Sequence, residues 1–211
     1  MIFNHEAPEF QTPTYNRNNG AYWYSTEICK HIIPNVNTDR NWVTIGCYGK
    51  CFNHSVVFAH SNLYPYVYDS YLPAFDDLVL VCSWPQTYEA VRHLGTPVLL
   101  PMSVDTEYVK TFEREKDRGI CYAGRAEKCP DWLRFKSGID FISEVDRETF
   151  LSELARYRQV YAIDRVAIEA KVLGCEVLSY DDMFPDPDYW QVIDSRDAAP
   201  MLQRLIDEVD I

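Results

Sequence analysis

The sequence predicts an α/β fold with two lobes. Short apolar segments alternate with amphipathic helical segments along the chain, which is the rhythm of parallel sheets joined by right-handed crossovers. A polar, charged run at residues 103–118 separates two halves that share this rhythm. We therefore expect two Rossmann-like lobes with parallel sheets, facing each other across a cleft, at residues 1–103 and 104–211.

Elements of the first half follow from apolar runs and their boundary residues. After a first strand at 1–4, a polar loop ending in Asn19 and Gly20 leads into a helix that Pro34 stops. This loop is a candidate phosphate or acceptor loop, or a plain turn and cap. Further strands are predicted at 42–47, 55–59, 77–82 and 98–101. Before the last of them, Ser83-Trp84-Pro85-Gln86 has capping-box spacing and opens a helix that Gly95 closes.

The second half repeats the pattern. Its strands are predicted at 119–123, 139–143, 159–163, 176–179 and 190–193, and its helices near Trp132, at 146–157, from Asp164 to Gly174 and from Ser195. The last helix carries Leu202, Leu205, Ile206 and Val209 on one side. Such a stripe predicts a docked helix.

Residues 164–178 carry the most informative pattern. Asp164 can cap the first turn of a helix, and Gly174 can end it before the next strand. Small or apolar side chains cover most of this helix, so Glu169 is a single mid-helix acid beside a crossover, where α/β proteins bind ligands. The alternative is an ordinary surface ion pair with Arg165, four residues earlier.

Composition excludes several protein classes. Nearly half of the 211 residues are hydrophobic and 14% are aromatic, which indicates a globular protein. No run of about 18 apolar residues and no signal-peptide pattern occur, so we expect a cytoplasmic protein without a membrane span. The net charge of −12 disfavours nucleic acid as a partner. Small phosphate ligands need only local cations and amides.

Cysteine usage points to reduced thiols. Seven cysteines are scattered along the chain, several of them inside apolar runs, which favours core residues over disulfides. Cys47 and Cys51 with His54 could suggest zinc, but a structural site needs a fourth ligand. The acidic residues at 181–188 fit a solvated loop better than a metal site, and we expect no metal.

Two short motifs in the second half occur in a fixed order. A strand ends in Gly124-Arg125, and Lys128 follows shortly after. Farther along, a helix contains Glu169-Ala170 and reaches Gly174 just before a strand. In this order they resemble the nucleotide-sugar-binding domain of GT-B glycosyltransferases, particularly the large retaining family.

The resemblance extends upstream and covers residues 55–211. Val104-Asp105 matches the usual Val-Asp of the crossover between the family's domains, and His60 follows a strand where the family often has a cleft-facing histidine. The chain is similar to a small, divergent GT-B protein, whose first lobe would serve the acceptor and whose second lobe would bind the donor.

The resemblance implies a metal-independent glycosyltransferase of the hexosyltransferase type, which moves a sugar from a nucleotide diphosphate sugar to an unknown acceptor. It implies that Gly124, Arg125 and Lys128 hold the donor diphosphate, that Glu169 contacts the ribose and that His60 is catalytic. Fixed cations stabilise the charge that sugar cleavage leaves on the diphosphate. No cofactor is implied beyond the nucleotide sugar itself.

Two positions depart from the family pattern. Tyr161 stands where a second carboxylate is usual, and Glu176 stands where proline is usual. Tyrosine cannot offer a full negative charge to sugar hydroxyls or to a developing oxocarbenium ion. The alternative function is therefore a catalytically inactive GT-B-like module that binds a nucleotide or a protein. A DNA-base-modifying enzyme of this architecture is disfavoured by the acidic charge.

Overall fold

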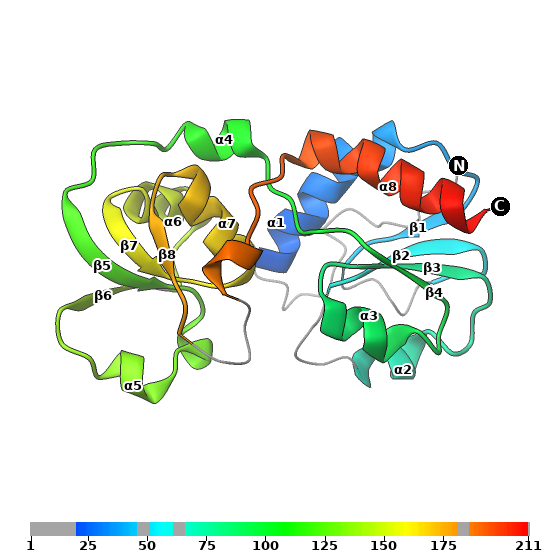
Figure 1. The fold of residues 1–211 in the computed structure, drawn as a ribbon, viewed down its shortest axis with the longest axis horizontal. Coiled ribbons are helices and arrows are strands. Elements are labelled where there is room, and N and C mark those ends of the chain that lie inside the picture. Colours follow the sequence, from blue (N-terminus) through cyan, green and yellow to red (C-terminus); the bar gives the residue numbers. More distant parts are fainter. Residues whose placement is uncertain (1–19, 46–50, 61–65, 181–185, 211) are drawn as a thin grey trace. The chain divides into compact units, whose positions relative to one another are not determined.

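The computed structural model describes residues 20–45, 51–60, 66–180 and 186–210. It confirms an α/β fold with two four-stranded parallel sheets (Figure 1). The chain divides into two compact units, each with one sheet: unit 1 comprises residues 1–102 and 195–211, and unit 2 comprises residues 103–194. The arrangement of two lobes across a cleft stays a prediction.

The sheet of unit 1 runs in chain order. Its strands are β1 (Asn41–Val43), β2 (Ser55–Ala59), β3 (Leu78–Cys82) and β4 (Thr96–Leu99). Every residue of β2 and β3 is buried, which requires cover on both faces of the sheet and explains their continuous apolar sequences.

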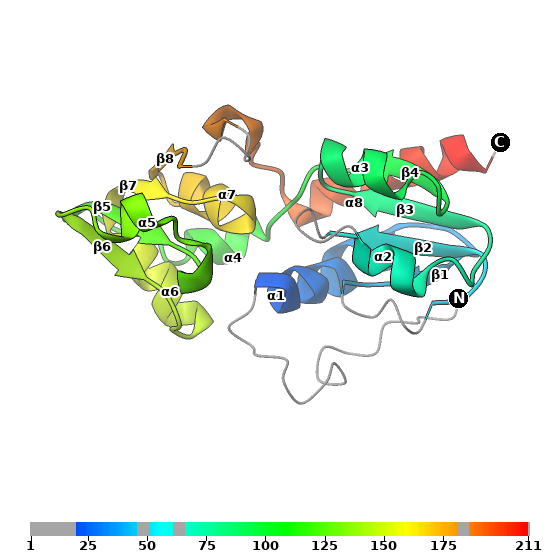
Figure 2. The same ribbon diagram turned by 90° about the horizontal axis from the view of Figure 1, so that it is seen from below.

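Helices lie on both faces of this sheet, with α2 and α3 on one face and α1 and α8 on the other (Figures 1 and 2). The helical elements are α1 (Gly20–Glu27), the π-turn η2 (Ile28–Ile32), η3 (Ile33–Asn35), α2 (Tyr66–Tyr71), α3 (Pro85–Val91) and α8 (Ser195–Val209). Alternate strand residues such as Val57 and Leu80 pack with Tyr68 of α2 and with Leu72, which follows α2, in one core cluster. Successive side chains of a strand point to opposite faces of the sheet, and this alternation decides which strand residues contact the helices on each face.

The last helix belongs to unit 1, whereas the sequence prediction placed residues 195–211 in the second lobe. The predicted docking of this helix is confirmed, because Leu202 and Ile206 are buried and α8 contacts η2 and η3. Its apolar stripe shows that the helix docks, but a stripe carries no information on which sheet receives it. The boundary predicted at 103/104 is otherwise close to the observed one at 102/103.

Charged residues join the amino ends of the unit 1 strands to the end of α8. The ring of His54 contacts Asp77 through Nδ1 at 2.6 Å and Asp39 through Nε2 at 3.0 Å. These two hydrogen bonds raise the pKa of His54 above its usual value. The buried guanidinium of Arg40 also bonds Asp77, at 3.0 Å, and Asp210, at 2.7 Å.

The sheet of unit 2 does not follow chain order. Its strands are β5 (Arg118–Ala123), β6 (Ile139–Ile142), β7 (Tyr157–Tyr161) and β8 (Glu176–Leu178), and they lie in the order β6-β5-β7-β8. The chain thus leaves β5 toward one side and later returns to add β7 on the other side. Strand order reverses between β5 and β7.

Short helices connect these strands, and α6 and α7 contact the strands that they join. The helical elements are α4 (Thr106–Lys110), η5 (Ala126–Lys128), α5 (Asp131–Arg134), α6 (Arg147–Leu154), α7 (Asp164–Val172) and η6 (Pro187–Tyr189). Lys116 holds the ends of α6 and α7 together, since its ammonium donates to the carbonyls of Ala155 at 2.7 Å and Leu173 at 2.6 Å. A cation is favourable there because both helix dipoles end in partial negative charge.

The carboxyl end of α7 confirms the sequence prediction. Gly174 has φ +74°, its N–H donates to Lys171, and the N–H of Cys175 donates to Ala170. This pair of bonds is the Schellman motif, which needs a residue in the left-handed region and so favours glycine.

Three local predictions are wrong. Residues 190–193 form no strand; Val104 and Asp194 make an isolated parallel bridge instead. Asp164 is the first residue of α7 and its side chain makes no cap hydrogen bond, since Ile163 is the N-cap. Likewise α3 begins at Pro85 with Trp84 as N-cap, so Ser83 does not cap it. The predicted strand at 1–4 lies outside the described residues.

Candidate functional site

The carboxyl ends of β5 and β7 form the candidate site of unit 2. Ligands of open α/β sheets bind outside the carboxyl ends of the strands, at the point where strand order reverses. In this sheet that point lies between β5 and β7. The loop that follows β5 contains Gly124, Arg125 and Lys128, and the turn that follows β7 contains Asp164.

The loop after β5 requires glycine at its first position. Gly124 has φ +154°, and a Cβ there would lie 3.1 Å from the hydroxyl of Tyr122. That hydroxyl donates to the carbonyl of Arg125 at 2.8 Å, so it is held in place and cannot easily move aside. The backbone at Gly124 is therefore left uncovered by any side chain of its own.

Lys128 and Asp164 bring the two loops together. The Nζ of Lys128 lies 3.6 Å from Oδ2 of Asp164, and the side chains are only 23% and 20% exposed. Asp164 has φ +57°, and its Oδ1 is buried and accepts no hydrogen bond from the described residues. A non-glycine residue in this region and an unsatisfied buried carboxylate oxygen both cost free energy, as is common at functional sites.

Burial shifts the pKa of both groups toward the neutral form. It raises the pKa of Asp164, and the charge of Lys128 only partly opposes this. It lowers the pKa of Lys128, against the opposing effect of Asp164. Both charges of the pair are therefore poorly solvated, and each is only partly compensated by the other. An incoming anion that accepts a hydrogen bond from Lys128 would stabilise the charged lysine.

Arg125 lies in the same loop with its side chain at the surface. The guanidinium is 56% exposed and lies 3.2 Å from the carboxylate of Glu127. An exposed pair of this kind contributes little free energy. Arg125 can therefore exchange Glu127 for another anion at small cost.

Glu169 lies elsewhere, in a buried group of three charges. Its carboxylate is fully buried, accepts from Arg147 at 2.8 Å through Oε2 and from Arg165 at 2.5 Å through Oε1, and accepts a second, shorter bond from Arg147. Burial alone would raise the pKa of Glu169, but the two guanidinium groups outweigh it and hold that pKa below its usual value. The pairing with Arg165 is confirmed, although it is buried and not on the surface.

This arrangement occupies the carboxylate that the family resemblance assigned to the ribose. Both oxygens of Glu169 already accept hydrogen bonds from arginine, and neither is exposed. Contact with a ribose would require the three charges to separate in a buried setting, which is costly. The sequence could not reveal this, because Arg147 lies 22 positions from Glu169.

Aromatic side chains surround the end of β7. The rings of Trp132 and Tyr161 meet edge to face, with their centroids 6.0 Å apart, and the ammonium of Lys136 lies 5.8 Å from each centroid. Trp132 is 52% exposed and Phe135 is 82% exposed. Large exposed aromatics next to a polar loop offer a stacking surface for a base or a sugar.

The remaining candidates belong to unit 1. His60 follows β2 in unit 1 and packs against Tyr24 of α1, with 5.3 Å between ring centroids. Gly20 is the exposed first residue of α1, and Asn19 lies outside the described residues. Gly124, Arg125 and Lys128 lie in one loop, and beside Lys128 the structure adds Asp164, for which the sequence had predicted only a capping role.

No zinc site is found in the described part of the chain. Among these residues no group of three or more His, Cys, Asp or Glu side chains could hold a metal ion. Cys51 is a buried free thiol, both ring nitrogens of His54 contact aspartates, and Cys47 lies outside the described residues. Nor does any described helix have the length and apolar character needed to cross a membrane.

Comparison of the sequence with protein-family profiles and with curated proteins finds no match. The site must therefore be interpreted from its own geometry.

Proposed function

We propose that unit 2 binds the diphosphate of a nucleotide sugar at Lys128 and Arg125, and that the protein transfers the sugar to an acceptor without a metal ion. The observation that carries this proposal is the poorly solvated pair of Lys128 and Asp164 at the reversal point of the sheet. Gly124 begins the same loop, but its N–H already donates to the carbonyl of Ile142 at 3.1 Å, so the two cations, and not this amide, would hold the phosphate.

The chemistry needs positive charge near the leaving group. When the bond between the sugar and the diphosphate breaks, negative charge grows on the diphosphate, and fixed cations stabilise that charge most in the transition state. Lys128, held in a partly buried position, supplies a preorganised cation. Arg125, which is exposed and paired only with the exposed Glu127, supplies a second one.

The nucleobase would stack on the aromatic surface next to the loop. Trp132 belongs to α5, directly after the Lys128 loop, and Arg134 of the same helix donates to the carbonyls of Ala126 and Cys129 at 2.8 and 3.2 Å. These bonds fix α5 to the loop that holds the proposed phosphate site. A base on Trp132 and a diphosphate on Lys128 are thereby supported by one continuous segment.

A second candidate function is nucleotide binding without sugar transfer. The observation that favours it is Glu169, whose carboxylate is held by two arginines in the buried group described above. The hydroxyl of Tyr161 in place of a carboxylate favours it as well. Both candidates share the phosphate site and differ only in turnover.

Calorimetric titration with uridine diphosphate and with inorganic pyrophosphate tests the shared part. Lys128→Met should weaken both ligands by about tenfold or more, since a hydrogen bond to a charged group is lost. Lys110→Met, the same change at an exposed residue of α4, serves as the control and should leave both affinities unchanged. Trp132→Ala should weaken uridine diphosphate only.

Turnover then separates the two candidates. Release of uridine diphosphate from its sugars by the native chain, lost in Lys128→Met, supports transfer; tight binding with no release supports the binding module. His60→Ala should abolish transfer with unchanged nucleotide affinity if His60 is catalytic. Absence of binding by uridine diphosphate and by pyrophosphate would overturn both candidates.

A further inference from the structure

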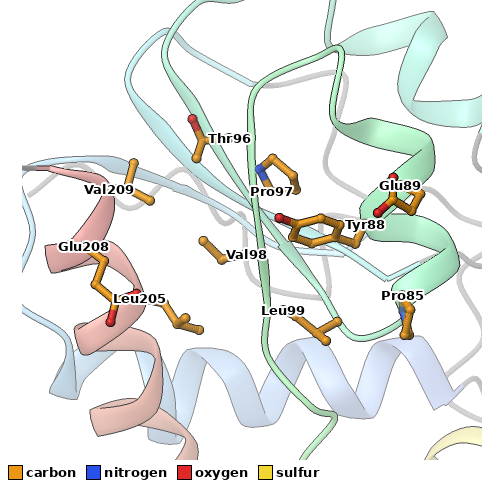
Figure 3. Close-up of a pocket in the computed structure, with 10 residues that line it drawn as sticks. All are labelled: Pro85, Tyr88, Glu89, Thr96, Pro97, Val98, Leu99, Leu205, Glu208 and Val209. Atoms are coloured by element: carbon orange, nitrogen blue, oxygen red, sulfur yellow. The ribbon is translucent and has the colours of Figure 1, made fainter.

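Unit 1 has an open groove of about 560 Å³, and its lining shares no residue with the proposed nucleotide site of unit 2. Its floor is the strand β4, and its walls are α3 and the second half of α8 (Figure 3). The lining residues are Pro85, Tyr88 and Glu89 of α3, Thr96, Pro97, Val98 and Leu99 of β4, and Leu205, Glu208 and Val209 of α8.

The floor of the groove is the edge of a sheet. Among the described strands β4 pairs only with β3. The N–H of Leu100 donates to the carbonyl of Cys82 of β3 at 2.9 Å. Backbone polar groups of successive strand residues point to opposite edges of the strand, so those of Pro97 and Leu99 point away from β3 and toward the groove. Proline has no N–H to donate, but at this outward position β3 would not have accepted one. Edge strands tolerate proline at such positions.

Two outward backbone groups on β4 match one residue of an added strand. In a parallel ladder a residue donates its N–H to the carbonyl before its partner and accepts from the N–H after it. Here the partner would be Val98, with the carbonyl of Pro97 as acceptor and the N–H of Leu99 as donor. Leu99 is 42% exposed although it belongs to a strand.

The side chains of the groove specify what such a strand would carry. Tyr88, Leu205 and Val209 give both walls an apolar surface, while Glu89 and Glu208 are exposed on α3 and α8. No lysine, arginine or histidine lines the groove, but Arg92 at the C-cap of α3 pairs with Glu89 at 3.0 Å, so Glu208 supplies most of the negative charge there. An occupant with apolar residues flanked by lysine or arginine is complementary in both respects.

We propose that this groove binds an extended peptide segment of a partner protein, rich in apolar and basic residues, which adds a strand to the edge of β4. Backbone bonds to Pro97 and Leu99 supply affinity that does not depend on sequence. Adjacent side chains of an extended peptide point to opposite faces, so one contacts α3 and the next contacts α8. Strand addition of this kind is a recurring mode of peptide recognition.

Titration of the ¹⁵N-labelled full chain with the acetylated and amidated peptide Gly-Lys-Val-Val-Lys-Gly tests the proposal. We expect saturable shifts of the Leu99 amide and its neighbours, with a dissociation constant below about 1 mM. The same peptide with glutamate in place of lysine should bind at least about fivefold more weakly. Glu208→Lys should weaken the lysine peptide about fivefold, whereas Glu115→Lys, an equal change of charge on an exposed residue of unit 2, should not.

The backbone contribution has its own variant. Leu99→Pro removes the outward N–H and should weaken the peptide several-fold, while Leu99→Ala retains that N–H and controls for the side chain. If Leu99→Pro does not fold, Glu208→Lys still decides the case. No saturable shift, equal affinity for both peptides, or shifts away from β4 would overturn the proposal. So would shifts at Leu99 that depend on protein concentration alone, because a second copy would then be the occupant.

Discussion

Replacing Glu169 by glutamine should destabilise the protein strongly, even with no ligand present. The carboxylate is fully buried, and its partners Arg147 and Arg165 have side chains only 8% and 4% exposed. The substitution leaves two buried guanidinium groups without a counter-charge. Breaking a buried ion pair from one side costs about 3–5 kcal/mol, a large part of the 5–15 kcal/mol by which domains are usually stable.

Urea denaturation, followed by circular dichroism and tryptophan fluorescence, measures this loss. Glu148→Gln, the same change at an exposed position of α6, should alter the free energy of unfolding by no more than about 0.5 kcal/mol. Replacing all three charged residues by Met or Leu should recover most of the stability, because no buried charge then remains.

The same variant separates a structural role from a ribose-binding role. If Glu169 serves the fold, Glu169→Gln lowers stability while the folded fraction retains its affinity for uridine diphosphate. A loss of less than about 1 kcal/mol in unfolding free energy, combined with weaker nucleotide binding, would contradict a purely structural role, since it would show that the carboxylate is available to a ligand.

Three further predictions concern stability. The pKa of His54 is raised in the folded state, so its contribution to the free energy of unfolding is fully present below the unfolded pKa of about 6.5 and is lost as pH rises through the folded value. Because the ring is 42% exposed, we expect the free energy of unfolding to fall by about 1 kcal/mol or less between pH 6 and 8. Urea titration should show this decline in the native chain and not in His54→Gln. Gly95→Ala would place a Cβ 2.5 Å from the carbonyl oxygen of Leu78 and should cost about 1–3 kcal/mol by thermal unfolding, while Gly119→Ala, with open space around it, should be nearly neutral. Lys116→Met removes the donor shared by α6 and α7 and should cost about 2 kcal/mol; an unchanged melting temperature would show that water replaces the ammonium.

Much of the fold could be predicted from local sequence. The strand 55–59 is predicted to the residue and the strand 78–82 within one residue, because both are nearly continuous apolar runs that are buried along their whole length. The strand 139–142 is also predicted within one residue, although it contains Asp140 and is only partly buried. Gly174 was predicted to end α7 because only a residue free of strain at positive φ suits that position. The strand predicted at 190–193 failed, since a short apolar run does not by itself find a pairing partner.

The candidate site could be predicted only in part. The order of Gly124, Arg125 and Lys128 in one loop is a local property, so the sequence was sufficient to group them. The roles of Asp164 and Glu169 depend on residues that lie far away in the chain, Lys128 and Arg147 respectively. Local pattern therefore suggested a cap for the first and a ligand contact for the second, and the tertiary structure assigned both to ion pairs.

Local sequence was sufficient for the α/β class, the positions of most strands and the docking of the last helix, because hydrophobic periodicity and turn residues act over a few positions of the chain. The strand order of unit 2, the sheet that receives α8 and the burial of the three charges around Glu169 became known only from the folded chain. These depend on which segments pack together across the chain, and periodicity within one segment says which face is buried but not what covers it.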